Sequence, residues 1–199
     1  FDTFRLDYYS QSVWPGRGSS PRDNMDLVYE VCLNYAQKFG RFYFKNLFLS
    51  GAPGLGKTFL SACIARSVSE QGRSVVYDTA GNIFAQFETR KFQRDAEGVQ
   101  TALDETRRYL TCDLLILDDL GSEFNSAFLI SSLYSLLNNR LGAKLPTIVT
   151  TNITDGALLE KLYTEKISSR LSAFVPCLFA GDDIRTQKAC LLYTSDAAD

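Results

Sequence analysis

One glycine-rich stretch has the residue types and spacing that hold a phosphate. GAPGLGKT, residues 51–58, matches the pattern G-x-x-x-x-G-K-[ST], after an apolar run and before a helix-like pattern that starts near Lys57. Glycine and proline let successive backbone N–H groups converge on a phosphate, and the helix N-terminus adds partial positive charge. Lys57 would reach the β- and γ-phosphates, and Thr58 would bind Mg²⁺. A plain glycine-rich turn with a surface lysine is the alternative, and the flanking strand and helix patterns argue against it. The candidate nucleotide contacts are Gly51, Ala52, Pro53, Gly54, Leu55, Gly56, Lys57, Thr58 and Phe59.

Two adjacent carboxylates end the apolar run LLILDDLG, residues 114–121. If this run is a buried parallel strand, Asp118 and Asp119 lie at the carboxyl edge of the sheet, where such folds bind ligands. Like charges this close repel unless a cation or its water shell lies between them. Asp118 therefore suits Mg²⁺, bound through water, and Asp119 is the candidate for orienting or deprotonating an attacking water. Alone, the pair would more often end a strand as a turn, but after a phosphate loop it completes a nucleotide–Mg²⁺ site.

Three further polar residues could join this site. Asn152 ends the apolar run PTIVTTN and could hydrogen-bond a γ-phosphate or the attacking water. On spacing alone, a turn that caps the helix from Asp155 onward explains it equally well. Arg170 in KISSRL and Arg185 in GDDIRTQK could each belong to the site, or be solvated or salt-bridged as most arginines are.

Five short β-rich runs must position these residues. Helical patterns separate most of them, and their nearly continuous apolarity indicates strands buried on both faces of a parallel sheet. The expected fold is a three-layer α/β domain with helices on both faces and right-handed crossovers. An amphipathic helix is expected over 25–39, and the longest helical tract over 81–110. The five runs are residues 46–50, 74–78, 113–119, 146–152 and 175–180.

Length and composition limit the class of protein. The chain has 199 residues, 45% of them hydrophobic, which suits one compact domain. The formal charge of -2 gives no global attraction to nucleic acid, and the absence of His leaves catalysis to carboxylates, Lys, Arg and backbone. Five cysteines without a C-x-x-C pair favour a reduced, cytoplasmic chain. No run approaches the roughly 18 apolar residues of a membrane span, and a start at Phe1 indicates a fragment.

Taken in order, these motifs resemble a known group of ATPases. FLSGAPGLGKTFL, LLILDDLG, PTIVTTN, ISSRL and GDDIRTQK, with FDTFRLDYYS at the start, are similar to the AAA+ ATPase domain of DnaC-type replicative helicase loaders and the related IstB-type transposition helpers. The resemblance covers residues 1–188 and implies a P-loop NTPase whose five-stranded parallel sheet has the order 5-1-4-3-2. The roles it implies are Walker A for residues 51–58, Walker B for Asp118 and Asp119, sensor 1 for Asn152, an arginine finger toward a neighbouring subunit for Arg170, and sensor 2 for Arg185.

The resemblance also implies ligands and partners. ATP and Mg²⁺ would be the cofactors, and single-stranded DNA a ligand. The chain would assemble with nucleotide into an open ring or spiral and bind a replicative helicase through an N-terminal module that precedes this sequence. An arginine supplied in trans is worth about 10³ to 10⁵ in rate, so the monomer should be a weak ATPase. Asp119 stands where most AAA+ proteins have Glu, and this shorter carboxylate favours slow hydrolysis.

The candidates for DNA contact lie in the insertion over 81–110. Lys91 and Arg94 are the first choice, as contacts to phosphate. Three phenylalanines beside them could stack on bases, although most of them fit core positions better; they are Phe84, Phe87 and Phe92.

The resemblance suggests one AAA+ domain over residues 1–189. An arm and a helix would form residues 1–44, and the P-loop core residues 45–189. The last ten residues, CLLYTSDAAD, fit neither strand nor helix and are interpreted as a non-native or disordered tail over 190–199.

Three other functions remain open. A transposition helper would use the same chemistry on duplex target DNA with a transposase. A nucleotide-gated interaction module would bind ATP without significant turnover, because Asp119 reaches less far. A P-loop kinase would phosphorylate a small metabolite, although Asn152 and the paired aspartates favour activation of water.

Overall fold

Five parallel strands form one sheet in the computed structural model, which describes residues 1–14, 18–92, 106–123 and 126–187. Their order across the sheet is β2-β3-β4-β1-β5, which confirms the order expected from the resemblance. Each strand lies within about two residues of its predicted run. The strands are β1 (Leu47–Ser50), β2 (Val75–Thr79), β3 (Leu114–Leu120), β4 (Thr147–Thr151) and β5 (Val175–Leu178).

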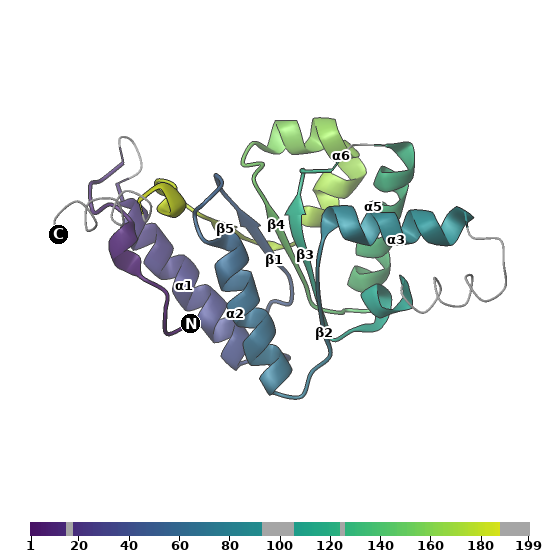
Figure 1. Cartoon of the computed structure of the whole chain (residues 1–199), viewed down its shortest axis with the longest axis horizontal. Coiled ribbons are helices and arrows are strands. Elements are labelled where there is room, and N and C mark those ends of the chain that lie inside the picture. The colour runs from purple at the N-terminus through teal and green to yellow at the C-terminus, as the bar shows by residue number, and fades with distance from the viewer. Residues whose placement is uncertain (15–17, 93–105, 124–125, 188–199) are drawn as a thin grey trace, which may run out of the picture.

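Helices cover both faces of this sheet, as predicted. In Figure 1, α1 and α2 lie on one side of the strands, and α3, α5 and α6 lie on the other. Among the described residues, no helix combines the length and the apolar character needed to cross a membrane. The helices are α1 (Pro21–Gln37), α2 (Lys57–Glu70), α3 (Ala80–Phe92), α5 (Ala127–Gly142) and α6 (Gly156–Leu171), with a short 3-10 helix at Leu6–Tyr8.

The core has two halves, one on each face of the sheet. Alternate residues of β3 supply both: Leu114 and Ile116 join the half beneath α1 and α2, and Leu115 and Leu117 join the half beneath α3, α5 and α6. The predicted burial on both faces holds for β3 and β4 and for most of β1. It is wrong for β2 and β5, which are mostly half-buried, because they are the two edge strands of the sheet.

One charged side chain is completely buried in this core. Arg140 of α5 donates from Nε to Thr147 Oγ1 at 2.9 Å, and from its two other nitrogens to the carbonyl oxygens of Tyr109 and Pro146 at 2.8 and 2.7 Å. A guanidinium is tolerated in a core only when its donors are satisfied. Arg140 thereby ties α5 to the start of β4, the strand that the candidate residue Asn152 follows.

The insertion after β2 is described only in part. Phe84 is buried and Phe87 packs against the core beside it, so both occupy the core positions that the sequence favoured. The side chains of Lys91 and Phe92, and all of Arg94, lie outside the described residues. The residues 190–199 also lie outside them.

Candidate nucleotide-binding site

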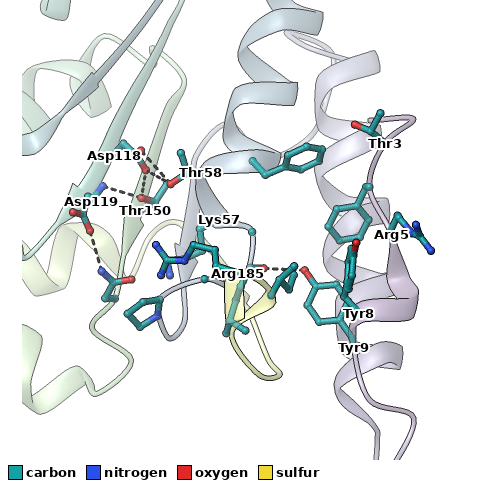
Figure 2. Close-up of a pocket in the computed structure, with 18 of the residues that line it drawn as sticks. Thr3, Arg5, Tyr8, Tyr9, Lys57, Thr58, Asp118, Asp119, Thr150 and Arg185 are labelled. Atoms are coloured by element: carbon teal, nitrogen blue, oxygen red, sulfur yellow. Dashed lines mark hydrogen bonds between the residues drawn. The ribbon is translucent and has the colours of Figure 1, made fainter. Parts of the chain in front are cut away.

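A pocket of about 480 Å³ opens at the carboxyl edge of the sheet. The loop between β1 and α2 lines its middle, the ends of β3 and β4 line one side, and the N-terminal arm lines the other. Figure 2 shows this order: Thr58, Asp118, Asp119 and Thr150 gather on one side, the arm residues on the other, and Lys57 and Arg185 between them. The sequence-predicted residues Asn152 and Arg185 are among the lining residues, whereas Arg170 is not.

The loop is shaped by glycines in conformations that other residues rarely adopt. Gly56, the residue before α2, has φ +90°, and Gly54 has φ +76°. A Cβ at Gly54 would lie 1.9 Å from an oxygen of the Asp183 carboxylate, which presses on the loop from the segment after β5. The amide of Ile184 donates to the Gly54 carbonyl at 3.1 Å. This segment therefore holds the loop from outside, and the positive φ of residue 54 favours glycine there.

Lys57 lies at the start of α2 with its ammonium over the loop. Its Nζ donates to the carbonyl oxygens of Gly51 and Ala52 at 2.6 and 2.8 Å. An ammonium has three donors, so one remains for a phosphate oxygen. Burial lowers the pKa of Lys57, and the charges of Asp119 and Asp118 oppose that shift. A bound phosphate would supply the negative charge that this partly desolvated cation needs.

The acidic side of the pocket is built around the buried carboxylate of Asp118. Tyr77 of β2 donates to its Oδ2 at 2.8 Å, and Thr150 of β4 donates to its Oδ1. The Thr58 hydroxyl lies 3.3 Å from Oδ2. Hydroxyl and carboxylate oxygens are the ligands that Mg²⁺ prefers, so Thr58 and Asp118 are the residues that would hold such an ion here.

A β-bulge brings Asp119 into the same pocket. Successive strand residues normally point to opposite faces, but the register of β3 against β4 shifts between Leu117 and Leu120. Asp119 has φ +58°, a left-handed conformation that Asp adopts more readily than most residues. Its amide donates to Thr150 Oγ1 at 2.9 Å. The backbone thus favours the short aspartate at a position where the longer glutamate is usual in AAA+ proteins.

Asn152 is directed at Asp119. Its Nδ2 donates to Asp119 Oδ1 at 3.0 Å, across the ends of β4 and β3. Asn152 does not cap the next helix, which was the alternative role. Asp155 caps α6 instead, accepting from the amide of Ala157 at 2.9 Å.

The two candidate arginines lie in different places. Arg185 lines the pocket and forms an ion pair with Asp183 at 3.2 Å, and this partner lowers the pKa of the Asp183 carboxyl. Arg170, near the end of α6, lies over the ring of Tyr134 on α5, with its Cζ 4.1 Å from the ring centroid. It also donates to the Tyr134 hydroxyl and to Asn138 Oδ1, at 2.8 and 2.9 Å. Arg170 is therefore held in a defined position outside the pocket of its own chain.

Sequence reasoning missed two groups of lining residues. The first is in the arm, where Tyr9 donates to the Leu55 carbonyl at 2.9 Å and so fixes the arm against the loop. The arm residues in the pocket are Thr3, Phe4, Arg5, Tyr8 and Tyr9. The second group, Tyr77 and Thr150, positions Asp118. The signals available were an aromatic-rich arm and hydroxyl-bearing residues near the ends of otherwise apolar strands.

Tyr77→Phe should weaken Mg²⁺ binding, so that a higher Mg²⁺ concentration is needed to promote nucleotide binding. Nucleotide binding without Mg²⁺ should be unchanged. Burial raises the pKa of Tyr77, so its hydroxyl keeps the proton it donates to Asp118. A hydrogen bond to a charged group is worth about 1.5 to 3 kcal/mol, and we expect the Mg²⁺ concentration for half-maximal effect to rise about tenfold. Titration of Mg²⁺ with a fluorescent ATP analogue measures this. Tyr35→Phe removes an equivalent hydroxyl, bonded to the Lys45 carbonyl, and is the control; equal behaviour of the two variants would contradict the role.

Comparison with known proteins places the chain in a family. Residues 42–171 match the model of the IstB-like ATP binding proteins. The chain belongs to this family. The replicative helicase loader DnaC of Escherichia coli K12 is 26% identical over 122 residues, which cover 61% of this chain and 48% of the loader. The chain therefore spans about half the length of this curated relative.

Solved structures agree on the fold. A crystal structure of the DnaC helicase loader has a TM-score of 0.64 and 22% identity, covering 88% of this chain and 96% of that one. The replication initiator DnaA, solved with AMPPCP and single-stranded DNA, has a TM-score of 0.65 and 19% identity, covering 91% and 52%. These neighbours establish a five-stranded AAA+ P-loop NTPase fold.

Proposed function

We propose that this IstB-like protein is a Mg²⁺-dependent ATPase that acts as an assembly-gated switch in DNA replication. The observation that carries the proposal is the convergence of five groups from three separate segments, the start of α2, the end of β3 and the residue after β4, on one pocket. A phosphate loop alone would support nucleotide binding only. The acid pair and the amide beside it add what hydrolysis needs, a metal ligand and a group that activates water. The five are Lys57, Thr58, Asp118, Asp119 and Asn152.

Each group has a chemical task in this proposal. Loop amides and Lys57 bind the β- and γ-phosphates, and Thr58 and Asp118 hold Mg²⁺, which when bound neutralises charge on the phosphate oxygens. Asp119 accepts a proton from, or orients, the attacking water, and Asn152 holds the Asp119 carboxylate while its amide can also reach water or phosphate. Arg185 contributes positive charge from the segment after β5.

The arm is the natural place for the nucleoside. Phosphates bind at the loop, so the base and ribose extend toward the side of the pocket that the arm lines. Phe4 and Tyr8 offer aromatic surface there, and Arg5 offers hydrogen-bond donors. Because Tyr9 joins the arm to the loop, nucleotide binding and the position of the arm should be coupled.

Arg170 completes the site of a neighbouring subunit in this proposal. It lies outside its own pocket, and Tyr134 and Asn138 hold its guanidinium, with no ion pair to a carboxylate among the residues that the structure describes. Hydrolysis would then require assembly, in an open ring or spiral.

We propose that the protein acts in the cytoplasm and that its cellular task is to load a replicative helicase onto single-stranded DNA. The relatives named helicase loader and replication initiator support it, and one of them was solved with single-stranded DNA. The helicase would bind through sequence outside this chain, and Lys91 and Arg94 stay candidate DNA contacts. The family match equally supports a transposition helper that acts on duplex DNA. Preference for single-stranded over duplex DNA favours the loader, and the reverse favours the helper.

Two measurements on the wild-type chain test the activity. ATP with Mg²⁺ at 100 times the dissociation constant should raise the free energy of unfolding by about 2.7 kcal/mol. Phosphate should be released slowly, and faster with single-stranded DNA. Stabilisation without any phosphate release would instead indicate a nucleotide-gated interaction module. Transfer of phosphate to a metabolite, with no effect of DNA, would indicate a kinase.

A further inference from the structure

The segment that leads into β1 exposes every second residue. From Arg41 to Asn46, exposed and partly buried residues alternate, so that Arg41, Tyr43 and Lys45 face solvent while Phe42 and Phe44 are partly buried. Arg41 lies in a turn and Phe42 and Tyr43 in a bend, so the three exposed residues form a row along the chain and not one face of a strand. This row lies at the amino edge of the sheet, opposite the nucleotide pocket.

The aromatic residue in this row is both exposed and firmly supported. Tyr43 is 90% exposed, the highest value among the large hydrophobic residues that the structure describes as exposed. Its ring stacks on Phe42, with centroids 4.9 Å apart and planes at 19°, and meets Phe44 edge-on at 5.1 Å. Phe42 and Phe44 in turn contact the buried Tyr35 of α1. Tyr43 therefore offers a flat ring to solvent on a fixed base.

Cations flank this tyrosine along the chain. Lys45 Nζ donates to the carbonyl of Lys144 at 3.3 Å, which brings a second exposed lysine, in the turn between α5 and β4, to the same edge. Lys38, in the turn before Arg41, adds a further cation. Within the described ranges, none of these four forms an ion pair with a carboxylate.

The two segments that carry these cations contain no acid, and the nearby Glu70 at the end of α2 is paired with Arg66 at 2.8 Å. No Asp or Glu occurs over residues 31–69 or 124–154, the two segments that carry the four cations. Asp113, the carboxylate before β3, accepts from the amide and hydroxyl of Ser74. Basic side chains gathered beside one another without acids repel, and a polyanion would relieve that repulsion.

We propose that this amino-edge patch, formed by Lys38, Arg41, Tyr43, Lys45 and Lys144, binds single-stranded nucleic acid. A base stacks on Tyr43 and the cations on either side contact the phosphates, a combination suited to unpaired strands because their bases are free to stack. An acidic protein surface would match the same charge, and competition by poly-glutamate distinguishes it from an unpaired strand. The inference rests on the proposed function only in expecting nucleic acid as a ligand, and it adds a site apart from Lys91 and Arg94.

Fluorescence anisotropy with labelled oligo(dT) tests the patch in the 199-residue chain, without nucleotide and over a range of salt concentrations. Tyr43→Ala should weaken binding about tenfold with an unchanged salt slope, because one stacked base is lost. Tyr43→Trp should retain binding. Lys45→Ala should reduce the slope of log affinity against log salt by about 0.7, the loss of one phosphate contact. Lys161→Ala and Leu27→Ala, exposed on α6 and α1, are the matched controls.

Three results would overturn the proposal. The first is wild-type affinity in both Tyr43→Ala and Lys45→Ala, which would place the oligonucleotide elsewhere. The second is a pair of observations: Tyr43→Ala binds labelled oligo(dT) with wild-type affinity, and poly-glutamate displaces the labelled oligo(dT) as well as unlabelled oligo(dT) does. Together they would indicate an acidic protein partner. The third is no binding by the wild-type chain at low salt. If the wild-type chain binds oligo(dT) through Tyr43 but does not bind ATP, the proposed ATPase is refuted and the proposed nucleic-acid site is supported.

Discussion

Lys57→Ala should abolish ATP binding at concentrations that saturate the wild-type chain. The ammonium is the one cation at the centre of the loop among the described residues, and it contributes both charge and donors to the phosphates. Hydrogen bonds that involve charged groups are worth about 1.5 to 3 kcal/mol each, so losing this contact should weaken ATP binding about a hundredfold or more. Titration with a fluorescent ATP analogue in the presence of Mg²⁺ measures the effect.

The variant should still fold. Burial lowers the pKa of Lys57, which means that keeping this ammonium charged destabilises the folded state. Removing the ammonium eliminates two hydrogen bonds to loop carbonyls, but it also eliminates the desolvation penalty of the buried charge. Thermal unfolding without nucleotide should therefore be close to wild type, and added ATP should no longer raise the midpoint. Lys161→Ala, an exposed lysine on α6, is the control for loss of charge. Wild-type affinity in Lys57→Ala would show that the loop does not bind the phosphates.

Arg170→Ala should leave ATP binding nearly unchanged and remove hydrolysis that depends on assembly. Arg170 does not line the pocket of its own chain, so binding by the monomer has no reason to change. An arginine that stabilises the transition state from a neighbouring subunit is worth about 10³ to 10⁵ in rate. The measurements are ATP affinity and phosphate release at concentrations where the wild-type chain assembles. Tyr134→Phe keeps the ring under the guanidinium and removes only one hydrogen bond, so it should lose far less activity.

A mixing experiment separates action in trans from a structural role. Lys57→Ala retains Arg170 but cannot bind ATP, and Arg170→Ala retains the pocket but lacks the guanidinium. Each alone should be inactive, and together they should recover part of the wild-type rate if Arg170 acts on its neighbour. If the mixture stays inactive although both variants assemble, or if Arg170→Ala alone hydrolyses ATP at the wild-type rate, the finger assignment is wrong.

The sequence predicted the elements that have local signals. Continuous apolar runs located all five strands, and the glycine-rich pattern located the loop and the start of α2. The order of strands came from the resemblance, because parallel pairing joins distant segments and periodicity carries no information on neighbours. Placement of Asp118 and Asn152 at one edge followed from parallel strands, whose carboxyl ends lie together.

What the sequence could not predict depends on contacts between distant segments. Alternation along a strand would direct Asp118 and Asp119 to opposite faces, and only the bulge against β4 brings both to the pocket. The hydrogen bond from Tyr77 to Asp118 joins β2 to β3, and nothing in SVVYD distinguishes that tyrosine from a core residue. The arm reaches the pocket because Tyr9 bonds to the loop, a contact between residues 46 positions apart.

The rate of ATP hydrolysis per chain, measured against protein concentration with and without oligo(dT), tests the central claim most directly. An assembly-gated switch predicts a rate that is low when the chain is dilute, rises with concentration, and rises at lower concentration when single-stranded DNA brings chains together. The rise should disappear in Arg170→Ala, and all hydrolysis in Lys57→Ala. A rate per chain that is constant over concentration and indifferent to DNA would contradict the account.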